Sequence, residues 1–318
     1  MADAPSLLDR RLLIVTGKGG VGKTAIASAL AVMAASAGRR TLVCEIDAKG
    51  GLAATLESEP LEFEPREIQP NLFAMSMDTE ASLKEYLSLQ LRLPLVARVG
   101  PLARSFDFLA NAAPGVKEIL TIGKLCWEVK ERHYDLVIAD AAASGHVVGQ
   151  LAAADSINEL VSVGLVRSQT DWMLQILKDP AVTGTVVVAA PEEMPVTETL
   201  ELVEQLDTET EVDVAAVVAN RVLPALFSRS EADDFERLDD EEANAPLAAV
   251  AGEATGAILE AAHLARSLRR NRAGHLERLA TGLGPDIPLV YVPELFLRTH
   301  GIRATSRIAE HLEMELGQ

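Results

Sequence analysis

The chain of 318 residues has only two cysteines, Cys44 and Cys126. Two thiols cannot form a disulfide framework or a Cys-x-x-Cys metal site within one chain. The six histidines show no paired spacing typical of metal ligands. The fold must therefore be stabilised by an apolar core, and the hydrophobic content of 48% is sufficient for one.

Basic residues are also scarce, because 29 Lys and Arg stand against 47 Asp and Glu, a formal net charge of −18. Such a charge repels DNA and anionic lipid, so we expect no nucleic-acid partner. The sequence has no uncharged apolar run of about 18 residues. Its first ten residues are polar and unlike a secretion signal. These absences predict a cytoplasmic protein that reaches a membrane only peripherally, through a partner.

The most informative stretch lies near the N-terminus. A short β-branched strand at 12–16 is followed by a glycine loop and then by an alanine-rich helix at 25–37. The loop matches Gly-x-x-x-x-Gly-Lys-Thr, in which backbone N–H groups and a helix N-terminus surround phosphate oxygens. The alternative is a chance glycine turn. The predicted phosphate-binding residues are Gly17, Lys18, Gly19, Gly20, Val21, Gly22, Lys23, Thr24 and Ala25.

The pattern assigns separate tasks to the two residues that end the loop. Lys23 is expected to pair with the β- and γ-phosphates of ATP, and the Thr24 hydroxyl to bind Mg²⁺. The extra Lys18 is either a solvated loop charge or a second cation for a transferring phosphoryl group.

Two acidic residues follow predicted buried strands. Asp47 comes after the strand at 41–46, and Asp140 after the strand at 134–139. Strand ends of a doubly wound sheet face the ligand crevice, so both carboxylates are predicted near the phosphates. Asp140 is expected to hold the Mg²⁺ hydration shell. Asp47 is expected to orient or deprotonate the attacking water and to join the metal site; the alternative is a cap for a short helix near Gly51.

Further buried strands at 72–77, 183–190, 212–219 and 288–292 alternate with helices, which predicts an α/β, three-layer fold with a mostly parallel sheet. We expect one domain over 1–318, an irregular connection at 57–70, helical structure at 151–177 and a flexible loop at 141–146. The helices at 82–93, 95–109 and 116–130 predict an inserted helical subdomain at about 79–131, above the crevice. His146 is either a switch residue or ordinary packing.

Together these parts resemble the arsenite-pump and tail-anchored-protein-targeting ATPase family, which belongs to the deviant Walker A class. The similarity extends from about residue 11 to 300. Its markers are the loop Gly17–Thr24, Asp47, the segment from Asp140 to Ser144-Gly145-His146, Pro191-Glu192 before Thr197-Glu198-Thr199, Asn220-Arg221 and Pro293-Glu294.

The resemblance implies a dimer that closes on ATP and handles a protein client or a membrane-transport partner. Lys18 would reach the other subunit's phosphates and assist catalysis. Asn220 and Arg221 would lie beside the adenine base of the nucleotide. The Asn220 amide matches the hydrogen-bonding edge of adenine. Pro293 and Glu294 would enclose the base from the other side.

The sequence departs from the family after Asp47, where Ala48-Lys49-Gly50 replaces the usual Pro-Ala-His. The departure motivates an alternative, in which the chain is a weakly active or inactive nucleotide-binding subunit that pairs with a related chain in a heterodimer. The zinc-binding Cys-x-x-Cys of eukaryotic members and a thiol cluster for arsenite are both absent.

Overall fold

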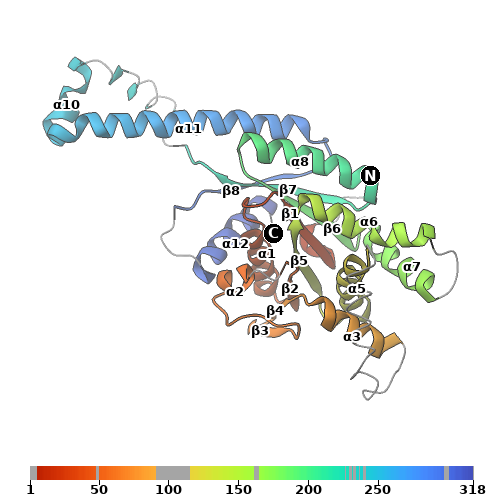
Figure 1. Ribbon diagram of the computed structural model, residues 1–318. Helices are drawn as coiled ribbons and strands as arrows, with labels where there is room; N and C mark the ends of the chain where they lie inside the picture. Colours follow the sequence, from red (N-terminus) through yellow and green to blue (C-terminus); the bar gives the residue numbers. More distant parts are fainter. Residues whose placement is uncertain are drawn as a thin grey trace.

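The computed structural model describes residues 6–47, 50–90, 115–160, 165–225, 227–228, 231, 234–235, 237–238, 241–296 and 301–317. Eight strands form one sheet in the order β3-β4-β2-β5-β1-β6-β7-β8, and helices cover both of its faces (Figure 1). The α/β fold expected from the sequence is confirmed. The strands are β1 (Leu12–Gly17), β2 (Thr41–Glu45), β3 (Arg66–Gln69), β4 (Leu72–Ser76), β5 (Leu136–Ala143), β6 (Thr183–Ala189), β7 (Val214–Val222) and β8 (Leu289–Pro293).

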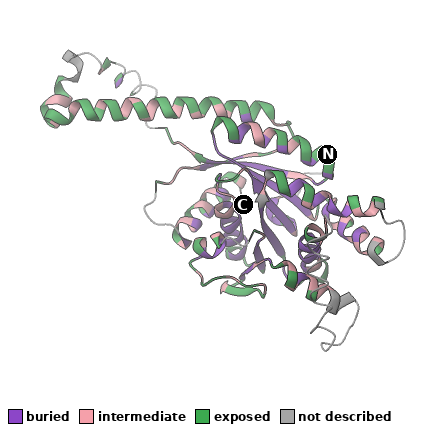
Figure 2. Cartoon of the chain, in the orientation of Figure 1, coloured by how far each residue is buried: buried purple, intermediate pink, exposed green. Residues whose placement is uncertain are grey.

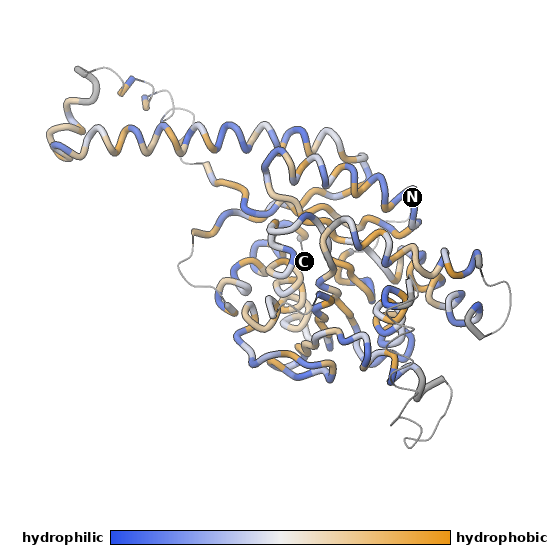
Figure 3. Tube along the Cα trace, viewed as in Figure 1, coloured by the Kyte–Doolittle hydropathy of each residue, from blue (hydrophilic) through white to orange (hydrophobic). Residues whose placement is uncertain are grey.

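The central strand β1 lies between β5 and β6, and all six of its residues are buried. Side chains alternate along it: Leu13 and Val15 face one apolar core, whereas Leu12 and Ile14 face the other. The central strands are accordingly buried while the helices expose their outer faces (Figure 2), and hydrophobic residues follow these strands (Figure 3). A strand buried on both faces needs the continuous apolar sequence seen here.

Two helical layers cover the sheet. One contains α1 (Lys23–Ser36), α2 (Gly51–Thr55) and α12 (Ile302–Leu316), and the other contains α5 (Val116–Glu131), α6 (Ser144–Leu160), α7 (Leu165–Leu177) and α8 (Glu193–Gln205). A π-helical turn, Leu206–Thr210, follows α8. Among the described residues, no helix is both long and apolar enough to cross a membrane.

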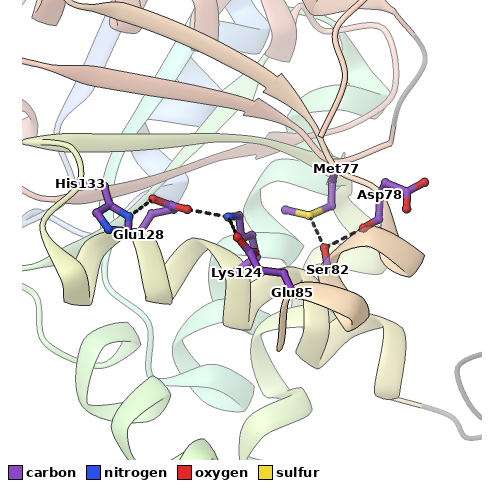
Figure 4. A network of polar contacts seen from close by, with 7 residues as sticks. All are labelled: Met77, Asp78, Ser82, Glu85, Lys124, Glu128 and His133. Atoms are coloured by element: carbon purple, nitrogen blue, oxygen red, sulfur yellow. Dashed lines mark hydrogen bonds and ion pairs between the residues drawn. The ribbon is translucent and has the colours of Figure 1, made fainter. Parts of the chain in front are cut away.

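Two elements lie outside these layers. Helix α3 (Thr79–Gln90) packs on α5, where the buried Lys124 bridges Glu85 at 2.8 Å and Glu128 at 2.7 Å (Figure 4). The 28-residue helix α11 (Thr255–Gly282) lies along α8 and then extends beyond the body, with α10 (Glu241–Ala251) at its far end (Figure 1).

Two expectations about local structure were wrong. The stretch 57–70 is not wholly irregular, because Arg66–Gln69 pairs antiparallel with β4 across a turn in which Asn71 adopts a positive φ of 66°. No flexible loop covers 141–146, since Ala143 pairs with Gly17 and α6 begins at Ser144. The helical structure expected at 151–177 is confirmed by α6 and α7, and residues 161–164 between them lie outside the described residues.

The helical insertion at about 79–131 stays a prediction, because the helix expected at 95–109 lies outside the described residues. Its last helix, α5, packs against the sheet rather than above the crevice. Leu125, Cys126 and Val129 are buried there in the same core as the strands.

Candidate functional site

The glycine loop joins β1 to α1 at the centre of the sheet, as the sequence predicts. Gly22 has φ 100°, and a Cβ built there would lie 2.3 Å from Nδ2 of Asn220. Only glycine fits this position without displacing Asn220. The Asn220 amide donates a hydrogen bond of 2.8 Å to the Val21 carbonyl, so the end of β7 holds the loop in place.

The loop's two lysines have different partners. Lys23, at the first position of α1, donates to the Lys18 carbonyl oxygen at 3.3 Å, across the loop. The Lys18 side chain leaves the loop and forms an ion pair with Glu198 of α8. Gly19 and Gly20 lie exposed between them.

Thr24 and Asp140 meet at the end of the sheet. The Thr24 hydroxyl donates to Oδ2 of Asp140 at 2.7 Å, while Oδ1 of Asp140 is buried without a hydrogen-bond partner. Burial raises the pKa of Asp140 to about 6; the Thr24 hydrogen bond and Lys23 oppose this rise, and Glu45 and Asp47 add to it. A buried carboxylate with an unpaired oxygen is a site prepared for a cation.

The oxygen atoms of Thr24 and Asp140 fit Mg²⁺, which prefers hard oxygen ligands and binds with few protein groups. Within the described part of the chain, no three His, Cys, Asp or Glu side chains cluster around a common point. A magnesium ion here would therefore take its other ligands from water and phosphate rather than from a protein cage.

Asp47 is exposed just beyond β2, close enough to Asp140 to raise its pKa. The N-terminus of α2 is capped by Glu45, a residue that sequence reasoning missed, and the capping role of Asp47 stays a prediction. Glu45 is buried, and its Oε1 accepts from the backbone N–H groups of Gly51 at 2.8 Å and Leu52 at 3.3 Å. Ala48 and Lys49, which depart from the family pattern, lie outside the described residues.

A cavity of about 190 Å³ lies beside the loop, on the side of α1 that faces β7 and β8. The structure brings six predicted residues together around it, although they come from three distant parts of the sequence: Gly22, Ala25, Asn220, Arg221, Pro293 and Glu294. Phe296 and Thr305 also line the cavity, and no pattern in the sequence had marked them.

His146 lies exposed in the first turn of α6. Its role as a switch residue stays a prediction.

Known proteins are similar to this chain over much of its length. The model of the anion-transporting ATPase family matches residues 10–170 and 166–243. The ATPase BagA of Mycobacterium tuberculosis is 31% identical over 226 residues, which cover 68% of this chain and 66% of the relative. ATPase GET3 of Podospora anserina is 25% identical over a region that covers 69% of this chain and 76% of that relative. ATPase ASNA1 homolog 1 of Paramecium tetraurelia is 27% identical over a region that covers 66% of this chain and 74% of that relative. The chain thus spans about two thirds of the length of the mycobacterial relative.

Proposed function

The chain belongs to the family of anion-transporting ATPases, and we propose that it is a magnesium-dependent ATPase that acts as a nucleotide-switched dimer. One observation carries the proposal. The buried Asp140 keeps one carboxylate oxygen unpaired beside the Thr24 hydroxyl, at the N-terminus of α1. Burial of the unpaired Asp140 carboxylate is unfavourable, and a bound cation would offset this cost. The helix N-terminus beside it favours an anion, so the site is suited to a cation bound together with an anion.

The residues of the chain divide the work. The backbone of Gly17–Thr24 binds the phosphates, and Lys23 neutralises them. Thr24 and Asp140 hold Mg²⁺, which supplies charge neutralisation at the phosphoryl group. Asp47 orients the attacking water and accepts its proton. The adenine lies in the cavity between Asn220 and Pro293, with the Asn220 carboxamide holding the loop as well as bounding the base.

The test measures ATP binding and hydrolysis separately. Wild-type protein is expected to bind MgATP in calorimetry and to release phosphate. Asp47→Asn is expected to retain binding and to lose turnover by about 100-fold or more, because it removes the group that activates water. Asp78→Asn, a change at the start of α3, is the matched control. Absence of nucleotide binding by the wild-type protein would overturn the proposal, whereas equal turnover of both variants would remove Asp47 from the mechanism.

An apolar cavity of about 240 Å³ supports the proposed handling of a hydrophobic client. It lies between α3, α5, α6 and α7, away from the nucleotide site. Aromatic and aliphatic side chains line it, among them Leu83, Tyr86, Leu120, Trp127, Trp172 and Met173. A client bound there would be coupled to the nucleotide through α6, which continues directly from the strand that carries Asp140.

The alternative, a weakly active or inactive nucleotide-binding subunit of a heterodimer, depends on the replacement of Pro-Ala-His by Ala48-Lys49-Gly50. An active homodimer of the purified chain would argue against it. Hydrolysis only after co-expression with a related chain would favour it.

A further inference from the structure

The ion pair between Lys18 and Glu198 joins the phosphate loop to the middle of α8, across 180 residues of sequence. Each of the two side chains is 29% exposed. The loop's other lysine, Lys23, is directed back across the loop to the Lys18 carbonyl. The Lys18 ammonium is thus paired with a carboxylate that lies outside the loop.

Glu198 is held rigidly, because α8 is anchored on both sides of it. Val196 and Leu202 are buried in the core under the sheet. Thr197 accepts a hydrogen bond of 2.8 Å from Arg278 of α11. A carboxylate on a fixed helix sets the position of its flexible partner, so the pair restrains Lys18 more than it restrains Glu198.

From this geometry we propose that Glu198 is a positioning residue that holds Lys18 against α8 and withholds its charge from nucleotide phosphates. The inference rests on the proposed function. Phosphate oxygens and the Glu198 carboxylate compete for one ammonium group. Nucleotide contact by Lys18 therefore requires the ion pair to break, whether the phosphates belong to this subunit or to a second copy.

The expected consequence is that removing the Glu198 charge strengthens nucleotide binding. In Glu198→Gln, the dissociation constant for MgATP should fall about two- to fivefold, the range for a partly exposed ion pair. The same change in a Lys18→Met background should leave the constant unaltered, because there is no ammonium to release. Glu201→Gln, an exposed site on the same helix, is the matched control and should bind as the wild type does.

Calorimetric titration with MgATP, at low protein concentration and fixed ionic strength, separates the possible results. Tighter binding in Glu198→Gln that disappears with Lys18→Met supports the proposal. An unchanged or weaker affinity in Glu198→Gln, or an equal gain in both backgrounds, overturns it. Thermal unfolding of each variant confirms folding, and Glu198→Ala gives a second removal of the charge if Gln destabilises α8. If the wild-type protein binds no nucleotide, the proposed function fails; if it binds and only the variant result is absent, Glu198 alone loses its role.

Discussion

At the scale of single residues, the candidate site places a carboxylate where its charged form is unfavourable. Asp140 is only 6% exposed, and burial is the main cause of its raised pKa. Glu45 and Asp47 lie near it and raise the pKa further. Both carboxylates disfavour the charged form of Asp140, and a cation bound beside Asp140 would offset that repulsion.

Asp140→Asn is expected to stabilise the nucleotide-free protein. Because the folded pKa of about 6 exceeds the ordinary value of 3.8, the folded chain binds more protons than the unfolded chain between these two values. Above pH 6 the ionised Asp140 carboxylate therefore lowers the free energy of unfolding by its full amount. This destabilisation disappears as the pH falls toward 4. We expect the variant to gain about 1 to 2 kcal/mol at pH 7.5.

Urea unfolding at pH 7.5 and at pH 4.5 measures this difference. The gain of Asp140→Asn should be largest at pH 7.5 and should shrink at pH 4.5, while Mg²⁺-dependent nucleotide binding is lost. A variant that is less stable than the wild type at both pH values would contradict the account.

At the scale of elements, helices and buried strands could be predicted because their patterns are local. The strand at Arg66–Gln69 was missed because the flanking prolines indicate irregular structure, whereas its pairing with β4 is a tertiary contact. The small residues after Asp140 are typical of a loop, but Ala143 joins the ladder opposite Gly17. The packing of α3 on α5 includes a contact that the sequence does not reveal, the bridge of Lys124 to Glu85 and Glu128.

Lys124→Met should destabilise the contact between α3 and α5. The Glu128 side chain is only 6% exposed, so removal of Lys124 leaves a buried carboxylate that has lost its lysine partner and keeps a contact of 2.7 Å with Nδ1 of His133. We expect a loss of about 2 to 3 kcal/mol in the free energy of unfolding.

Lys117→Met, on an exposed position of the same helix, is the control and should change stability by less than about 0.5 kcal/mol. Chemical denaturation of both variants makes the comparison. Similar losses in the two variants would show that the Lys124 ion pairs contribute nothing specific.

At the scale of the whole molecule, the three-layer α/β fold with a mostly parallel sheet could be predicted, but the contacts between distant segments could not. Motif residues from three parts of the sequence line one cavity, as their places at strand ends imply. The pairing of Asn220 with Val21 and of Lys18 with Glu198 follows from packing of the finished fold, with separations of 199 and 180 residues. Periodicity and loop chemistry carry no information about such pairs.

The proposed dimer gives a prediction at this scale. Asp47→Asn with MgATP should accumulate in the closed state and show a mass twice that of the 34.0 kDa chain in light scattering. The wild-type protein without nucleotide should show the mass of one chain. A single-chain mass for the ATP-loaded variant would contradict the homodimer and would favour pairing with a related chain.

The length of helix α11 would turn a small tilt at one end into a larger displacement at the other. Near its C-terminal end it is fastened to α8, where Gly282 contacts Leu200 and Arg278 donates to Thr197, whereas its opposite end projects beyond the sheet (Figure 1). A helix of 28 residues is about 42 Å long, so a tilt of roughly 5° at the fastening would displace the far tip by about 4 Å. A small rotation of the helix that carries Glu198 would thus be magnified at a distance from the nucleotide.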